Sequence, residues 1–182
     1  MKEAWGEFLA DVEQISKNSE EECYEALCAI AERALDRSIN VIVRSKEEIK
    51  AAYRAAVYGE ISLLFGNILT EEDAEEAKQR ANLAFRELLE EKHEFNGFIP
   101  KGILIDTPLA LLTALPADGI DFFCYDLEKL TMLLTKEKKT AQTHRQRIRQ
   151  IIEERITSAR PAKTIETKLP INRGIWVFGE GI

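Results

Sequence analysis

Short apolar runs alternate with longer amphipathic segments along this chain. β-branched and aromatic residues dominate the short runs, and turn residues or helix starts follow them, a pattern typical of strands. The runs predicted as strands are residues 39–43, 61–65, 103–105, 120–124 and 174–178. The stretch 159–172 contains two prolines and no periodicity, so it is predicted to be a loop or a mobile connection.

The segments between the runs carry helix signals. Ser45 with Glu48 is a capping-box pattern that predicts a helix through about Tyr58, and Gly59 is its expected C-cap. Thr70 with Asp73 begins a longer helix, in which apolar residues recur every three or four positions. Further helices are predicted near residues 19–34, 109–115 and 148–156.

Strands separated by helices must pair in parallel, because the chain returns through a helical crossover. We therefore predict one α/β domain, residues 1–182, with a parallel sheet of about five strands and flanking helices. Polar residues follow the strands at Arg44, Gly66-Asn67, Asp106, 124–128 and Gly179-Glu180. They are the polar groups that a ligand-binding edge at the carboxyl ends of the strands needs. On position alone we favour the alternative, in which polar residues simply follow buried strands where the chain reaches solvent.

Composition and net charge exclude several classes of protein. A chain of 182 residues with 45% hydrophobic and 31% charged residues is typical of a soluble globular domain. The net charge of −7 disfavours binding to nucleic acid or to anionic lipid. No apolar run is long enough to span a membrane, and no secretory signal opens the sequence, so we expect a cytoplasmic protein. Three cysteines and two histidines indicate neither a disulfide framework nor a zinc site.

Several of these segments resemble one family. Residues 54–59 read R-A-A-V-Y-G, residues 102–108 read G-I-L-I-D-T-P, and residues 119–123 read G-I-D-F-F. In this order they resemble the C-terminal PEP-binding barrel of the PEP-utilising enzymes, such as PEP–protein phosphotransferase, pyruvate phosphate dikinase and PEP synthase. The strongest resemblance covers residues 54–123. It implies a (β/α)8 barrel that is incomplete here, because the first and last strands of the family have no counterpart.

The resemblance also implies site residues. Arg44 and Glu180 correspond to substrate-binding positions, and Asn67, on the same predicted edge, is a third substrate-binding candidate. Asp106 stands where the family has a magnesium-binding Glu. With a three-residue deletion, Asp126 is the second Mg²⁺ ligand; without a gap, Lys129 falls at that position instead. No catalytic residue is assigned.

The departures from the family matter equally. Trp5 replaces a PEP-binding arginine, and Phe178 replaces the cysteine that donates a proton. The favoured hypothesis is a diverged, catalytically impaired protein that binds a PEP- or pyruvate-like oxyacid or acts as an accessory subunit. The alternatives are an active Mg²⁺-dependent phosphotransferase or lyase, and an assembly module without a small ligand. Open barrel edges favour a homo-oligomer or a partner chain that covers them.

Overall fold

The computed structural model describes residues 8–15, 19–34, 37–113, 118–135, 146, 150, 162–165, 168–172 and 175–178. Its strands are β1 (Phe8–Asp11), β2 (Ile39–Val43), β3 (Ile61–Phe65), β4 (Lys101–Ile105), β5 (Phe122–Asp126), β6 (Ala162–Ile165), β7 (Lys168–Asn172) and β8 (Ile175–Phe178). Its helices are α1 (Val12–Ile15), α2 (Glu20–Ala34), α3 (Lys46–Ala55), α4 (Glu71–Glu91), α5 (Pro108–Thr113) and α6 (Leu127–Thr135). Most of the predicted helix at 148–156 lies outside the described residues.

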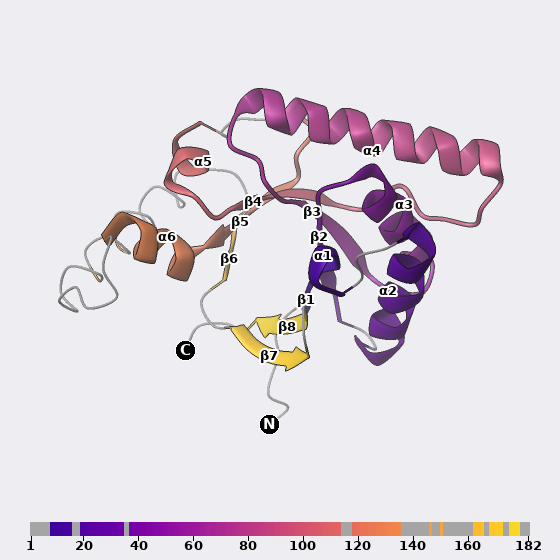
Figure 1. Ribbon diagram of the computed structural model, residues 1–182, viewed down its shortest axis with the longest axis horizontal. Coiled ribbons are helices and arrows are strands. Elements are labelled where there is room, and N and C mark those ends of the chain that lie inside the picture. The colour runs from indigo at the N-terminus through magenta and orange to yellow at the C-terminus, as the bar shows by residue number, and fades with distance from the viewer. Residues whose placement is uncertain are drawn as a thin grey trace.

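All the strands join one sheet in the order β6-β5-β4-β3-β2-β1-β8-β7. Each consecutive pair from β1 to β6 is parallel. The sheet curls into a half-barrel, with helices around its outer side (Figure 1). The predicted fold class, a parallel α/β sheet forming an incomplete barrel, is confirmed.

Two sequence-based expectations about the last third of the chain are wrong. The run at 174–178, expected to be parallel to its neighbours, forms β8, which is antiparallel to β1 and to β7. The short connection between β7 and β8 has no room for a helical crossover, so the chain reverses there. The predicted loop at 159–172 contains β6 and β7. Pro170 fits because β7 is an edge strand with an irregular register at that residue.

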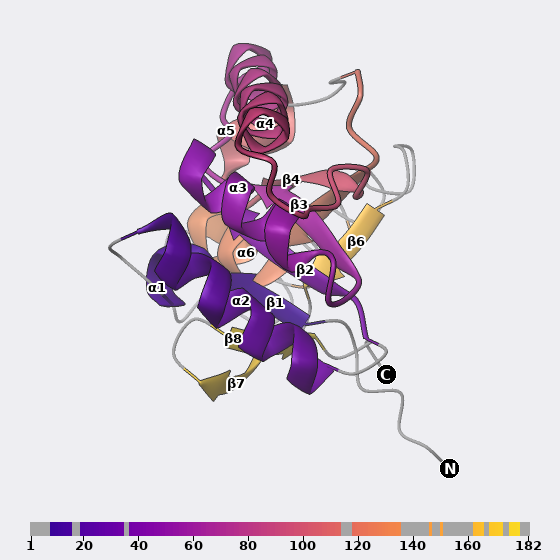
Figure 2. The ribbon, with the colours of Figure 1, turned by 90° about the vertical axis from the view of Figure 1, so that its right-hand side faces the viewer.

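The two faces of the sheet carry separate apolar clusters. On the outer face, alternate residues such as Val41, Leu63 and Phe123 pack in one large core with helices α2 to α4. These helices lie together on one side of the sheet in Figure 2. The inner face holds a smaller cluster of Leu9, Ile42, Leu64, Leu104, Phe122 and Cys124. Because both faces are buried, the strands read as continuous apolar runs.

The capping box predicted at the start of α3 is confirmed, and α4, which begins at the predicted place, has a capping box as well. Ser45 accepts from the Glu48 amide, Thr70 accepts from the Asp73 amide, and each acidic side chain accepts from its cap residue in return. Helix α3 ends at Ala55, earlier than predicted, and Gly59 does not cap it. A Cβ on Gly59 would lie 3.2 Å from Cβ of Ala31, so this glycine allows close contact with α2. No helix among the described residues combines the length and apolarity that crossing a membrane requires.

Candidate functional site

Five chain positions meet at the carboxyl edge of the parallel sheet. Asp11 ends β1 and Asp126 ends β5, while Arg44, Gly66 and Asp106 directly follow β2, β3 and β4. The parallel register carries these positions to the same edge. This is the edge at which open α/β sheets bind ligands. Arg44, Asp106 and Asp126, all predicted from the sequence, therefore share one edge.

Arg44 is held at this edge by Asp11. Its Nη1 donates to Asp11 Oδ1 at 2.6 Å and its Nη2 donates to Oδ2 at 3.0 Å, a bidentate pair. Glu13 adds an ion pair, with Arg44 Nε and Glu13 Oε2 3.3 Å apart. The hydrogen bonds that Arg44 donates to Asp11 raise the pKa of Arg44, which stays charged. Asp11 is buried and its partner is half-buried, so the guanidinium is fixed but still reaches solvent.

Gly66 lies against Ile42 and Arg44. A Cβ at Gly66 would lie 3.1 Å from Cγ2 of Ile42 and 3.4 Å from both Cγ and Nε of Arg44. A side chain there would therefore press on Ile42, while its Cβ would meet Arg44 at ordinary contact distance. The backbone of Arg44 is fixed as well, since its amide donates to Glu48 Oε2 at 2.5 Å.

The other two predicted substrate-binding residues are less defined. Asn67 is exposed and adopts a left-handed conformation with φ of 59° in the turn after β3. Asn tolerates this conformation better than most residues, so the turn alone accounts for its presence. Glu180, Gly179 and Trp5 lie outside the described residues.

The predicted metal-binding residues are joined by Lys129. The ammonium of Lys129 forms an ion pair with Asp106 Oδ2. The backbone amide of Lys129 donates to Asp126 Oδ1 at 3.0 Å, so Asp126 caps α6. The sequence left open whether Asp126 or Lys129 stands at the second metal-ligand position. In the structure Asp126 lies at the sheet edge, and the ammonium of Lys129 contacts Asp106.

Asp106 and Asp126, with the ammonium of Lys129 beside Asp106, do not form a suitable site for a divalent cation. Mg²⁺ prefers about six oxygen ligands, and an ammonium beside Asp106 repels it. Among the residues that the structure describes, no group of three or more His, Cys, Asp or Glu side chains is arranged to hold a metal ion.

Apolar side chains on the inner face of the sheet lie closer to the amino ends of the strands than these polar groups do. They include Leu104, Phe122 and Cys124, all buried. Gly102 leaves space for an aromatic ring: a Cβ there would lie 2.5 Å from Cε2 of Phe122. Cys124 is a buried thiol in this cluster and forms no disulfide.

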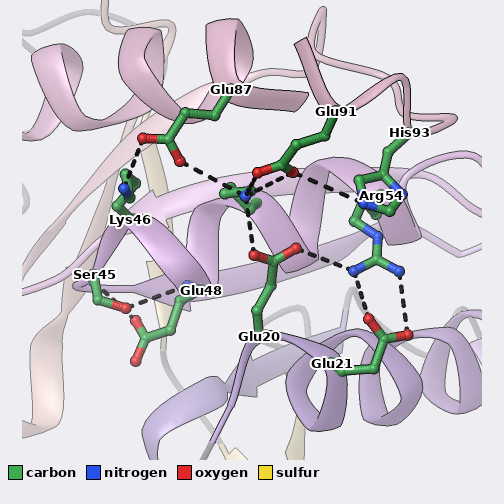
Figure 3. Close-up of polar contacts among 10 residues, drawn as sticks. Glu20, Glu21, Ser45, Lys46, Glu48, Arg54, Glu87, Glu91 and His93 are labelled. Atoms are coloured by element: carbon green, nitrogen blue, oxygen red, sulfur yellow. Dashed lines mark hydrogen bonds and ion pairs between the residues drawn. The ribbon is translucent and has the colours of Figure 1, made fainter. Parts of the chain in front are cut away.

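Arg54, which opens the resemblance at 54–59, lies in the helical layer and not at the sheet edge. Its Nη1 lies 3.0 Å from Glu20 Oε1 and 2.8 Å from Glu21 Oε2, and its guanidinium stacks over the ring of Tyr24 at 4.0 Å. Figure 3 shows it paired with two carboxylates of α2. Its contacts explain this arginine as a residue that joins helices.

Sequence reasoning missed Asp11. The four residues Phe8–Asp11 are too few for a clear alternating pattern, so β1 was not among the predicted strands. The usable signal was an acidic residue immediately after the apolar group 8–10. That arrangement matches the polar residues that follow the other strands.

Comparisons with known proteins agree with this fold. The family described as "PEP-utilising enzyme, PEP-binding domain" matches residues 11–165. A phosphoenolpyruvate-protein phosphotransferase of Haemophilus influenzae is 29% identical over 100 residues, covering 52% of this chain and 17% of the relative. The chain thus spans only a small part of the length of that relative.

Solved structures resemble the chain in fold. An HpcH/HpaI aldolase/citrate lyase family protein of Burkholderia cenocepacia superposes with a TM-score of 0.56 at 18% identity, over 82% of this chain and 65% of the other. A citrate lyase of Burkholderia xenovorans gives 0.55 at 14% identity, over 89% and 56%. Together with the family match over most of the sequence, the half-barrel shows that this chain belongs to the PEP-binding domain family of the PEP-utilising enzymes.

Proposed function

We propose that this chain binds a small PEP- or pyruvate-like oxyacid at the carboxyl edge of its sheet and lacks full PEP catalysis. The observation that carries the proposal is Arg44, a charged guanidinium held by Asp11 at that edge and still partly open to solvent. Asp11 engages one N–H on Nη1 and one on Nη2, and Glu13 pairs with Nε, so two of the five N–H donors, one on each Nη, remain for a carboxylate or a phosphate. Membership of the family supports an oxyacid of this class.

Two substitutions support the loss of catalysis. The resemblance implies that Trp5 stands where the family has a cation and that Phe178 stands where it has a proton donor; both lie outside residues 11–165, over which the family matches. Charge stabilisation and general acid–base catalysis each contribute large rate factors, so losing both leaves binding as the surviving property.

Calorimetric titration with oxalate, pyruvate and PEP tests the proposal. We expect saturable binding of at least one of them by the wild-type chain and a loss of tenfold or more, about 1.4 kcal/mol, in Arg44→Met. Lys46→Met is the matched control, because Lys46 pairs with Glu87 at 2.7 Å on the helical layer. Equal binding by wild type and Arg44→Met, or no binding of any of the three oxyacids, contradicts the proposal.

The alternative is an active phosphotransferase or lyase that holds Mg²⁺ at Asp106 and Asp126. The same titration, done with and without Mg²⁺, distinguishes this enzyme from the impaired protein. Oxalate binding that requires Mg²⁺, together with exchange of the methyl protons of pyruvate in deuterated water, favours an active transferase or lyase. Binding without proton exchange favours the impaired protein that we propose.

A second function, as an accessory or assembly subunit, is favoured by exposed apolar side chains on α5 and α6. Leu109 and Leu112 on α5 are 49% and 60% exposed. Met132, Leu133 and Leu134 on α6 are each about two-fifths exposed. Exposed apolar groups on neighbouring helices mark interaction surfaces. We propose that a second copy of the chain covers them.

Light scattering after size-exclusion chromatography tests this assembly. We expect an oligomer for the wild-type chain and a monomer for the double variant Leu112→Lys with Leu133→Lys. A wild-type monomer at every accessible concentration excludes the second copy as the occupant. Lys substitutions at Leu83 and Leu89, which are exposed on α4, are the control pair.

We also propose a reducing, cytoplasmic environment. The three cysteines, Cys23, Cys28 and Cys124, all lie among the described residues and form no disulfide there. Thiol titration of the unfolded protein, purified without reductant, is expected to find all three. A recovered disulfide contradicts this location.

A further inference from the structure

We infer that the ammonium of Lys129 takes the place of a divalent cation at the carboxyl edge, so that oxyacid binding by this chain needs no metal. The inference rests on the proposed oxyacid site and adds how its charge is supplied. It assigns to Lys129 a binding role and to Asp106 a positioning role.

The position of Lys129 follows from the two strands beside it. Asp106 directly follows β4 and Asp126 ends β5, and the register pairs Ile105 with Tyr125 one residue earlier on each strand. The two aspartates therefore lie at equivalent positions on neighbouring parallel strands. Helix α6 begins immediately after β5, which puts Lys129 in its first turn, over this pair of strand ends.

Lys129 contacts both aspartates. Its backbone amide donates to Asp126 Oδ1 at 3.0 Å, and its ammonium pairs with Asp106 Oδ2. Asp126 therefore serves as the N-cap of α6, and Asp106 serves as the partner of the Lys129 ammonium. Both carboxylates already have a partner in the protein. A divalent ion at these carboxylates would have to displace a cation already covalently attached to the chain.

The ammonium keeps capacity for a ligand. It has three N–H donors, and the bond to Asp106 uses one of them. The side chain of Lys129 is 45% exposed, whereas that of Asp106 is 18% exposed. Asp106 thus holds the ammonium from the protein side, while solvent reaches the ammonium from the other. The fitting ligand class is a small carboxylate or phosphate that accepts from an ammonium.

Titration of the whole chain with oxalate tests the inference directly. We expect equal affinity in Mg²⁺ and in EDTA, and a loss of tenfold or more in Lys129→Met under both conditions. Lys46→Met is the matched control and should bind like wild type. Circular dichroism melting shows whether each variant is folded. Oxalate binding that occurs only with Mg²⁺ overturns the inference and leaves the proposed oxyacid site standing.

Metal binding gives a second readout that does not depend on oxalate. With Mn²⁺ alone as the probe, followed by electron paramagnetic resonance, we expect no saturable binding by wild type. Lys129→Asp, which replaces the ammonium by a third carboxylate, should bind Mn²⁺ saturably. Saturable binding by wild type that matches Lys129→Asp overturns the inference. If oxalate binds neither with nor without Mg²⁺, the proposed function fails. The Mn²⁺ measurement then still shows whether Lys129 excludes a divalent cation.

Discussion

The helical layer and the sheet edge both contain Lys and Arg paired with carboxylates, but the two regions differ in burial and in the number of partners. In the helical layer, Lys50 lies within 4 Å of Glu20, Glu87 and Glu91, and its side chain is only 7% exposed. At the edge, the ion pair of Lys129 is with Asp106, and its side chain is 45% exposed. Figure 3 shows the helical network joining α2, α3 and α4.

This difference separates structural from ligand-binding cations. A buried cation with several carboxylates cannot release them without a large desolvation penalty, so it fixes the packing of helices. An exposed cation with one carboxylate contributes little to stability and can exchange water for a ligand at small cost. By this criterion Lys50 and Arg54 have structural roles, whereas Lys129 is available to bind a ligand. Arg44, which is half-buried, lies between these two classes.

The largest expected effect on stability comes from the helical network. Arg54→Leu leaves Glu20 and Glu21 without this partner and removes the contact with Tyr24. We expect the free energy of unfolding to fall by about 2–3 kcal/mol in urea titrations. Arg86→Leu, at an exposed site on the same layer, should change it by less than about 0.5 kcal/mol. Equal effects of the two substitutions would contradict the distinction between buried structural cations and exposed ones.

Arg44→Met is expected to have an intermediate effect. It leaves the buried carboxylate of Asp11 without its bidentate partner, and we expect a loss of about 1–2 kcal/mol in the same measurement. The double variant Arg44→Met with Asp11→Asn should recover part of that loss, because no buried charge is then unpaired. A double variant less stable than the single one contradicts this account of the pair.

Lys129→Met should change stability least among the three cations. We expect a difference below about 1 kcal/mol in urea unfolding, since the pair is exposed. The same variant is expected to lose oxalate binding. A loss of stability as large as that of Arg54→Leu would assign Lys129 to the structural class.

Acid should weaken the helical network selectively. The hydrogen bond from Arg54 lowers the pKa of Glu21, and that from Lys46 lowers the pKa of Glu87, each from an ordinary value of 4.5. Their contribution to stability is complete above pH 4.5 and is lost as pH falls through the lowered pKa values. Urea unfolding between about pH 5 and about pH 3 should therefore show a smaller loss for Arg54→Leu than for wild type. Parallel pH curves for the two proteins contradict the lowered pKa of Glu21.

The fold was predictable from the sequence where patterns are local. Capping boxes at Ser45 and Thr70 and apolar runs such as 61–65 identify strands and helices between residues 39 and 105, because caps and periodicity involve neighbours in the chain. The direction of β8 was not predictable, because it depends on pairing with β1 at the other end of the sequence.

The candidate site was predictable only in part for the same reason. Arg44, Asp106 and Asp126 could be found because each comes at a strand end. Of their partners, Asp11 was missed, because it reaches Arg44 across 33 positions, whereas Lys129, 23 positions from Asp106, was one of the two alternatives that the resemblance offered. A sequence shows which side chains carry charge, whereas the fold decides which charges neutralise each other.

The pairing of β1 with β8 has a consequence for folding kinetics. Leu9 lies opposite Trp176, so nearly the whole chain must be made before this contact forms. Such a contact closes a very large loop and raises the contact order, which slows folding. Asp11 lies opposite Ile42 of β2 and outside the pairing with β8, so we expect its contact with Arg44 to form with the parallel strands, before β8 joins the sheet.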